Sequence, residues 1–358
     1  MESRLPGYGP LVAVYEALPA KSTHEIASRR PSMSLANRIH YYRRIVSAYL
    51  LPGTSHLTFW HETPEANPRA LPGQLGEYYM TFAGKADYAG PRDSAGIPLL
   101  DYRGRIGLQY NPIAIAQYGL GNCNLYRRIG EASRRARFLG AADWLHSNLE
   151  QNAHGVWVWN HRFDWEYRDL LKSPWYSGLA QGQGISLLVR AHAETANTLY
   201  LESARKAFSS FLRSVDLGGV MCSGEKGRQW IEEYMVTPPT HILNGCIWAS
   251  WGIYDYFLAT GDSRANELFQ TVAQTLAEDL GKYDLGFWSL YERSGTRLKM
   301  VASPFYHRLH IVQLRVMHRL TGNETFNLYA DRWERYARSG VRRALALCYK
   351  SAFKLCYY

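Results

Sequence analysis

PTHILNGCIWASWGIYDYFLATG, at residues 239–261, opens with proline, continues as an almost unbroken apolar run and closes on glycine. Proline is favoured in the first turn of a helix, where its missing N–H costs no hydrogen bond, and apolar residues on every face are typical of a helix buried all round. Three further stretches begin in the same way, so that the four prolines are spaced by 62, 65 and 65 residues: PIAIAQYGLGN from Pro112, PWYSGLAQGQGISLLVRAH from Pro174 and PFYHRLHIVQLRVMHRLTG from Pro304. The repeat predicts four apolar helices.

A more polar, amphipathic segment follows each apolar helix. These segments predict second helices at about 131–151, 199–214, 263–280 and 324–339, and short links led by Gly155, Gly219 and Gly286 connect the units. A period in the sixties that combines an apolar helix with an amphipathic one indicates stacked helical hairpins. We therefore expect a mainly α protein, an incomplete α/α toroid of about four helical hairpins, over residues 111–358.

The four apolar helices would all begin at one mouth of such a toroid. The residues two positions after three of the prolines are Tyr176, His241 and Tyr306. We expect these side chains to converge on one cavity at the mouth; the alternative is that they only cap the helix bundle.

The first 110 residues have a different pattern. A helical stretch near 35–50 precedes a Pro- and Gly-rich segment at 51–73, and the alternating runs EYYMTFAGKADYAG (77–90) and IPLLDYRGRIGLQYN (97–111) follow. Alternation broken by glycine turns predicts one or two β-hairpins. The chain is therefore divided into an N-terminal helical and β-hairpin region, 1–110, and a toroid domain, 111–358, that would carry the site.

Charge and aromatic content point to an anionic partner. The 358 residues include 41 Lys+Arg against 31 Asp+Glu, a net charge of +10, and the aromatic residues include 26 Tyr. A positive balance suits a nucleic acid, a lipid surface or an acidic glycan. Two basic runs, at 127–137 and 332–354, are predicted as solvated helix faces, the second on a terminal helix packed against its own protein, with an interfacial helix as the alternative. No nucleic-acid-binding signature accompanies them, so nucleic acid is not expected.

Location and redox state follow from simple absences in the sequence. No apolar run reaches the ~20 residues of a membrane span, and MESRLPGYGP at the start resembles no secretory signal. The five cysteines never form CxxC, which speaks against a disulfide framework or a thiolate zinc site. We expect a cytoplasmic bacterial protein with no transmembrane segment, peripheral membrane association being the alternative.

Four clusters of polar and aromatic residues could carry chemistry: 230–234, 288–293, 303–308 and 173–184. The paired glutamates of the first are usually a surface feature, but between Trp and Tyr, in a link that returns to the mouth, one of them becomes a candidate base. His307 and His310 lack an acidic or thiol partner at ligand spacing, so no metal site is predicted. The glycines of 173–184 lack the Lys-Ser/Thr of a phosphate loop and fit close helix packing better.

Several of these motifs resemble the D-glucuronyl C5-epimerases. The resemblance rests on WYSGLAQGQGISLLVRAH, WIEEY followed by PPTHILNG, SPFYHRLHIVQL and YNPIAIAQYGLGN, and covers roughly residues 100–336. It implies a helical domain with the active-site cleft, a homodimer to which an N-terminal β-hairpin contributes, and conversion of D-glucuronate to L-iduronate within heparosan or heparan chains. The β-barrel module of animal members, with any calcium site in it, is not expected here, as in a bacterial-type member, and Met235 replaces the proline of their motif.

The resemblance also implies roles for individual residues. Glu233 and Tyr234 correspond to the family's catalytic EEY, Tyr291 to the tyrosine of the following strand, and Tyr306 to the tyrosine beside a histidine. The candidate substrate-binding residues are Tyr110, Asn111, Tyr176, Gln181, Asn244, Arg293 and His307.

C5 inversion explains why such residues are needed. A proton leaves carbon next to a carboxylate and another returns to the opposite face, which requires two groups on opposite sides of the sugar ring. Free Glu titrates near ~4.3 and free Tyr near ~10, so burial and neighbours must tune both, and a tyrosine near Arg or protonated His would ionise more easily. We assign Glu233 and Tyr306 as the opposed pair and Tyr234 and Tyr291 as assisting donors. The substrate carboxylate gathers negative charge in the reaction, and the candidate Asn, Arg and His would stabilise it.

Two other functions stay open at this point. A uronate polysaccharide lyase abstracts the same C5 proton and then expels the O4 glycan by β-elimination. A non-catalytic acidic-glycan-binding protein would use the tyrosines and tryptophans only as platforms for sugar rings. Neither alternative, nor the epimerase, requires a cofactor.

Overall fold

The computed structural model describes residues 59–102, 104–167, 170–224 and 227–357, all of which belong to the compact unit Tyr42–Tyr358. The helix predicted near 35–50 lies outside the described residues, as does the unit Met1–Tyr41. The division of the chain at residue 110 stays a prediction.

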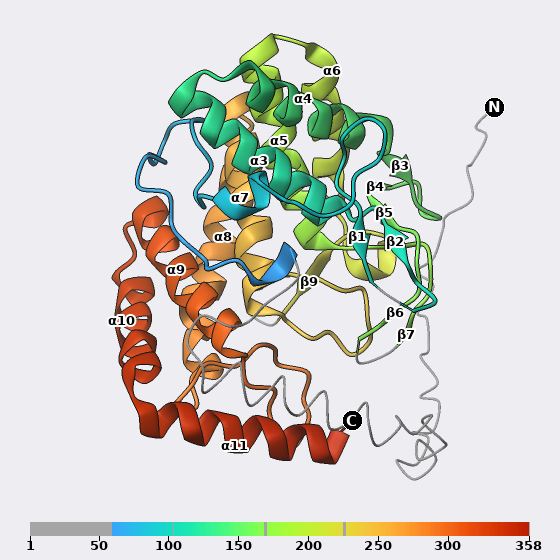
Figure 1. The fold of residues 1–358 in the computed structure, drawn as a ribbon. Coiled ribbons are helices and arrows are strands. Elements are labelled where there is room, and N and C mark those ends of the chain that lie inside the picture. Colours follow the sequence, from blue (N-terminus) through green and yellow to red (C-terminus); the bar gives the residue numbers. More distant parts are fainter. Residues whose placement is uncertain (1–58, 103, 168–169, 225–226, 358) are drawn as a thin grey trace, which may run out of the picture. The chain divides into compact units, whose positions relative to one another are not determined.

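Four helical hairpins follow one another along the chain (Figure 1), as the repeat predicts. Each pairs an inner helix with an outer one, and consecutive inner helices pack side by side. The inner helices are α3 (Pro112–Ile129), α5 (Gly178–Thr195), α7 (Leu243–Thr260) and α9 (Pro304–Thr321), and the outer helices are α4 (Ala132–Ser147), α6 (Thr198–Phe208), α8 (Ser263–Asp279) and α10 (Glu324–Arg338). The chain is thus mainly α, with the hairpin arrangement of an incomplete α/α toroid.

Burial separates the two layers. In α3, α5 and α7 every residue of the first 13 or 14 is buried, whereas the outer helices bury one face only. Helix α9 stands at the end of the series and also buries a single face. A helix surrounded on all sides must be apolar all round, which explains the apolar runs behind the prolines.

The inner helices do not all begin at their prolines. Pro112 and Pro304 occupy the first helical position, after caps from Asn111 and Ser303. Helices α5 and α7 instead begin four residues after Pro174 and Pro239. The prediction of helix starts at the prolines is therefore confirmed for two helices and wrong for the other two. Trp175 and Tyr176 form a short strand before α5, and His241 before α7 has a left-handed backbone.

Close approach of α5 and α7 depends on glycine. A Cβ on Gly182 would lie 2.4 Å from the Cα of Ala249, and a Cβ on Gly252 would lie 2.1 Å from the Gly182 carbonyl oxygen. Any larger residue would drive the two helices apart. Gly182 therefore serves helix packing, as predicted for the glycines of 173–184.

Short antiparallel hairpins make up the rest of the regular structure. The pairs are β1 (Leu100–Asp101) with β2 (Leu108–Gln109), β3 (Glu150–Gln151) with β4 (Trp157–Val158), β5 (Asn160–His161) with β8 (Trp175–Tyr176), β6 (Trp165–Glu166) with β7 (Leu170–Leu171), and β9 (Met221–Ser223) with β10 (Gln229–Ile231). The second predicted N-terminal hairpin is β1–β2. The first run instead contains the one-turn helix α2 (Ala83–Ala86), and the carbonyl of the preceding Phe82 packs on the bare backbone of Gly121 in α3.

The segment at residues 67–80 binds the C-terminal halves of all four inner helices. Asn124 of α3 accepts from the Tyr78 N–H and Arg319 of α9 donates to the Asn67 carbonyl. Arg190 of α5 donates to the Gly76 carbonyl, and Asp255 of α7 accepts from the Tyr79 hydroxyl. Arg190 and Asp255 also form a fully buried ion pair of 2.5 Å. This segment ties the helices together at the end opposite their N-termini.

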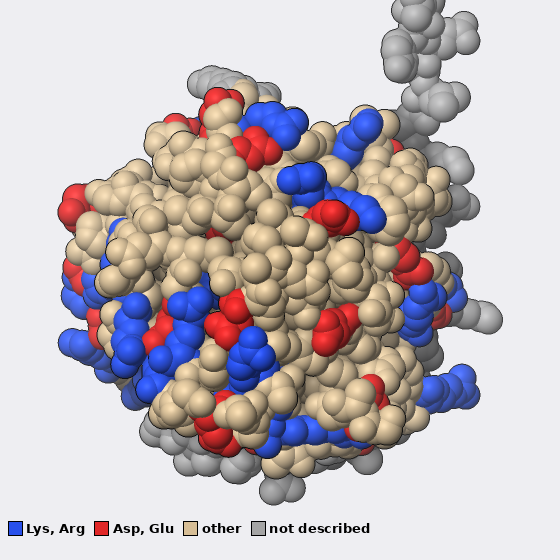
Figure 2. Space-filling model, turned by 90° about the horizontal axis from the view of Figure 1, so that it is seen from above, with Lys and Arg blue, Asp and Glu red and all other residues tan. Residues whose placement is uncertain are grey.

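Both basic runs belong to helices packed on the protein. In the first, Arg128, Arg134 and Arg135 form ion pairs with carboxylates. The second continues into α11 (Gly340–Tyr357), which buries Ala346 and Phe353 and leaves Val341 81% exposed. On the face seen in Figure 2, Lys and Arg are spread over the surface with acidic side chains among them. No helix among the described residues is long and apolar enough to cross a membrane.

Candidate functional site

The two predicted glutamates point to opposite sides of the chain that leaves β10. Trp230 of β10 faces Cys222 of β9, and the chain stays extended beyond the pair, because the Glu232 N–H donates to the Val220 carbonyl at 2.9 Å. Successive side chains of an extended chain alternate between its two faces. Glu232 therefore shares a face with Cys222, whereas Glu233 projects from the other face.

Glu233 lies close enough to Tyr234, Tyr291 and Tyr306 for its charge to act on each of them. Together with Tyr167 these residues form what we call the Glu233 cluster. The four tyrosines pack around the buried side chains of Ile242 and Ala302. Ring centroids are 4.5 Å apart for Tyr167 and Tyr234 and 4.8 Å apart for Tyr291 and Tyr306. The structure thus brings together all four residues predicted to be catalytic.

Separate elements hold these side chains in place. Tyr234 follows Glu233 directly, and Tyr291 is fixed by two backbone bonds, from Leu243 to its carbonyl and from its own N–H to Met300. Tyr306 stands in the first turn of α9, where its N–H bonds to the Ser303 hydroxyl. The glutamate and the tyrosines of the cluster are therefore supplied by separate parts of the chain.

Burial sets the protonation states of the Glu233 cluster. Glu233 is only 5% exposed, and burial raises the pKa of its carboxyl to about 7 despite an opposing polar interaction with Tyr234. Burial and then the Glu233 charge raise the pKa of Tyr234, Tyr291 and Tyr306. These three tyrosines are therefore un-ionised at neutral pH, and burial is the main cause.

Glycine makes room for the Glu233 carboxylate at the start of α7. A Cβ on Gly245 would lie 2.2 Å from Glu233 Oε2 and 2.9 Å from its Cβ. That same Oε2 is buried and has no hydrogen-bond partner among the described residues. An unpartnered acceptor is costly to bury and is available for a proton or a ligand.

Of the three residues expected at the substrate carboxylate, one keeps a side-chain acceptor without a partner among the described residues, and the other two are engaged elsewhere. Asn244 lies in the first turn of α7, and its Oδ1 is buried without a partner among the described residues. Arg293 instead donates to Asp279 at 2.7 Å. His307 is wholly buried: Nδ1 meets the Ser289 hydroxyl at 2.7 Å and Nε2 meets the Trp333 carbonyl at 3.0 Å, while burial lowers its pKa to about 3. His307 is therefore a neutral core residue, and Arg293 already neutralises another acid.

The remaining predicted binding residues do not join the Glu233 cluster. Tyr176 contacts the Gly219 carbonyl at 3.3 Å, and Tyr110, 38% exposed, donates to Asp93. Gln181 is fully buried and bonds to the Trp159 N–H and the Trp157 carbonyl. Asn111 caps α3 and donates to the Tyr102 hydroxyl at 2.7 Å. Gln181 and Asn111 thus serve the fold.

An aromatic wall extends the site toward β5–β8. Tyr102 packs on Phe163 at 4.6 Å between ring centroids, and Trp175 packs on Tyr234 at 5.7 Å. Tyr167 and Tyr102 were not among the predicted residues, and Trp175 was included only within the stretch 173–184. The surplus of aromatic residues in the sequence was the available signal, because it marks rings that could stack on sugars without saying which rings meet.

The third predicted mouth residue, His241, lies on the face of Glu232. Its ring nitrogen Nδ1 bonds to Glu232 Oε1. The expected convergence of Tyr176, His241 and Tyr306 on one cavity is therefore wrong, because only Tyr306 belongs to the Glu233 cluster. Cys222, Glu232 and His241 do place three ligand atoms close together, and they are the residues that could hold a metal. His307 and His310 instead share the Ser289 hydroxyl inside the core.

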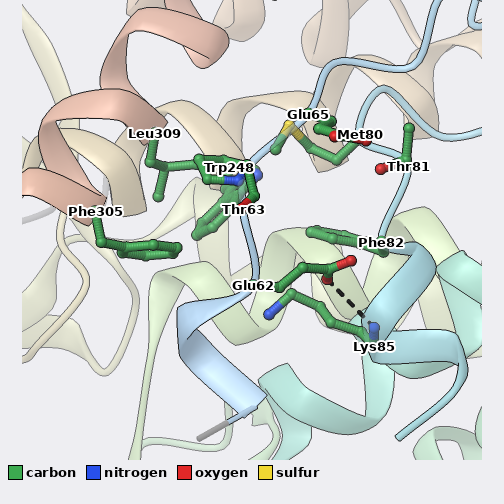
Figure 3. A pocket seen from close by; sticks show the side chains of 11 residues that line it. Glu62, Thr63, Glu65, Met80, Thr81, Phe82, Lys85, Trp248, Phe305 and Leu309 are labelled. Atoms are coloured by element: carbon green, nitrogen blue, oxygen red, sulfur yellow. Dashed lines mark hydrogen bonds between the residues drawn. The ribbon is translucent and has the colours of Figure 1, made fainter. Parts of the chain in front are cut away.

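A small pocket between α7, α9 and the start of the described chain contains none of the predicted site residues (Figure 3). Trp248, Phe305 and Leu309 line one side, and Glu62 and Lys85 lie at the other. The Lys85 ammonium donates to the Phe59 carbonyl at 2.7 Å, and burial lowers its pKa to about 7. Most of the residues that line this pocket are apolar, and one of them, Phe305, directly precedes Tyr306 in α9.

Comparison with known proteins bears on the family. The family described as D-glucuronyl C5-epimerase C-terminus matches residues 151–335, just over half of the chain. The D-glucuronyl C5-epimerase of Caenorhabditis elegans is 34% identical over 217 residues, which are 56% of this chain and 35% of that protein. An uncharacterized protein of Methanocaldococcus jannaschii is 30% identical over 179 residues, 49% of this chain and 56% of that protein. The chain therefore spans only about a third to a half of these relatives.

Solved structures resemble the chain more distantly. A cellobiose 2-epimerase from Bacillus thermoamylovorans is 11% identical with a TM-score of 0.49, covering 86% of this chain and 90% of that one. The enzyme from Spirochaeta thermophila is also 11% identical, with a TM-score of 0.48 and coverage of 87% and 89%. Scores at this level do not by themselves establish a shared fold. The family match does settle membership: this chain belongs to the D-glucuronyl C5-epimerase family, through the C-terminal domain that defines it.

Proposed function

We propose that this protein inverts C5 of D-glucuronate to give L-iduronate within a heparosan-like acidic polysaccharide. The observation that carries the proposal is the Glu233 cluster, in which a buried carboxyl with a pKa of about 7 is surrounded by protonated tyrosines. A base that titrates near neutrality can take a proton from carbon, and an un-ionised tyrosine can return one. Family membership supports the same reaction class.

In this proposal Glu233 and Tyr306 work on opposite faces of the sugar ring. Glu233 arrives from the loop after β10 and Tyr306 from the first turn of α9, so the two side chains approach from different elements. Tyr291 packs on Tyr306 and Tyr234 follows Glu233, which suits them to assist in delivering protons. Asn244 stands in the first turn of α7 with its Oδ1 unpartnered, an acceptor that suits a substrate hydroxyl, and its amide N–H group could donate to the carboxylate.

The test is proton exchange at C5 in D₂O with heparosan as the probe. We expect C5 deuterium and iduronate signals by NMR, without chain cleavage. Unsaturated uronate absorbing in the ultraviolet would show a lyase instead, and heparosan binding without C5 exchange would show a non-catalytic binder. Either result would overturn the proposal.

Assembly and location complete the proposal. We infer a homodimer, which size-exclusion chromatography with light scattering would measure, and a cytoplasmic protein, which cell fractionation would locate. The division into a region at 1–110 and a catalytic domain at 111–358 is part of the same proposal.

A further inference from the structure

The face of the chain opposite Glu233 carries a mixed set of side chains that the proposed reaction does not use. Cys222 comes from β9, Glu232 from the extended chain after β10, and His241 from the loop before α7. One ligand atom of each lies within 4.8 Å of the others. They are separated by ten and nine residues, so no sequence motif announces them.

Backbone contacts fix two of the three residues. Glu232 Oε2 accepts from the N–H groups of Thr240 and His241, at 3.3 and 3.0 Å. The His241 carbonyl accepts from the Tyr283 hydroxyl at 2.6 Å. His241 is also one of three non-glycine residues with positive φ among the described residues, at 49°. A left-handed residue held at both its N–H and its carbonyl is kept in that conformation by its surroundings.

The chemistry of the set favours a particular ion. Thiolate, imidazole and carboxylate are all ligands of Zn²⁺, and one carboxylate and one thiolate would neutralise its two charges. Glu232 is almost completely buried, whereas the His241 side chain is 25% exposed, so solvent can reach the site from one side. A three-ligand site with access to solvent leaves a fourth position for water.

We propose that Cys222, Glu232 and His241 bind a zinc ion that ties the β9–β10 hairpin to the start of α7. The loop so tied, residues 232–241, carries Glu233, and the ion would therefore hold the Glu233 loop in place from behind. The ordinary alternative is a histidine–carboxylate hydrogen bond that happens to lie beside a thiol. The two explanations differ in whether the thiol becomes a metal ligand, and this difference does not depend on epimerase activity.

Cobalt is the probe that reports a thiolate ligand. We expect the full-length protein, stripped of metal and titrated with Co²⁺, to show a near-ultraviolet thiolate-to-cobalt charge-transfer band that Zn²⁺ displaces. Cys222→Ser should abolish the band, and Glu232→Gln and His241→Ala should each weaken Co²⁺ binding at least about tenfold. His318→Ala is the matched control, because His318 is 29% exposed beside Glu324. Absence of the band in the wild type, or unchanged binding in His241→Ala, would overturn the proposal.

A second measurement needs no variant and stands even if a substitution unfolds the chain. Iodoacetamide alkylation followed by peptide mass spectrometry compares Cys222 with the exposed Cys348 in the same molecule. We expect Zn²⁺ to slow alkylation of Cys222 and leave Cys348 unaffected. Equal rates at Cys222 with and without Zn²⁺ would contradict a thiolate–zinc bond.

Discussion

Glu233→Gln tests whether burial keeps the Glu233 carboxyl protonated up to neutral pH. In the folded protein burial raises the pKa of this carboxyl from 4.5 to about 7, and unfolding restores the ordinary value. Between these two pH values the unfolded chain has lost the proton and the folded chain has kept it, so the free energy of unfolding falls as pH rises. At about 1.36 kcal/mol per pKa unit, the fall amounts to about 3 kcal/mol in total.

Urea denaturation of both proteins at a series of pH values from 4.5 to 8 measures this fall. Subtracting one curve from the other removes the contribution of the groups that the two proteins share. We expect Glu233→Gln to gain about 3 kcal/mol of stability relative to the wild type between the lowest and highest pH. Glu202→Gln, at an exposed position of α6, is the control and should show a flat difference. A flat or falling difference for Glu233→Gln would refute the reasoning.

Three further outcomes follow from the same geometry. The kcat/KM of the wild type should rise with pH through about 7, because the base acts only when ionised. A profile that is flat across this range would contradict Glu233 as the base. Gly245→Ala should lower kcat/KM at least about tenfold, because the added methyl group would occupy the space of Glu233 Oε2. The circular dichroism spectrum should stay unchanged. Full activity of this variant would exclude the close contact between Gly245 and Glu233. Arg190→Met should lower the free energy of unfolding, measured by urea denaturation, by about 3–5 kcal/mol, because it leaves Asp255 buried without its ion-pair partner. A loss of under about 1 kcal/mol would argue against that ion pair.

The helical hairpins could be predicted because the burial of each helix determines where apolar residues recur along its sequence. A helix such as α7, surrounded on all sides, reads as an apolar run, and α8 beside it reads as an amphipathic segment. The helix starts were predicted less well. The chain before α5 forms strand β8 after its proline, and the chain before α7 contains the left-handed residue His241. No local pattern distinguishes either path from a first helical turn.

Only those parts of the candidate site that lie within the motifs of the family resemblance could be predicted from the sequence. Glu233 lies near Tyr291 and Tyr306, and the catalytic roles of the three residues stay a prediction. Arg293 and His307 do not reach them, because Asp279 holds the arginine and the core encloses the histidine. Such partners come from distant parts of the chain, and a single sequence does not reveal them.

Exchange of the C5 hydrogen, followed separately with the D-glucuronate and L-iduronate epimers, tests most directly whether Glu233 and Tyr306 serve opposite faces. The assay compares Glu233→Gln and Tyr306→Phe in D₂O. We predict that neither variant inverts C5. Each variant should still exchange the C5 hydrogen of one epimer only, and that epimer should differ between the two variants. Three results would contradict this assignment: exchange with the same epimer in both variants, no exchange with either epimer in one of the variants, or continued inversion of C5.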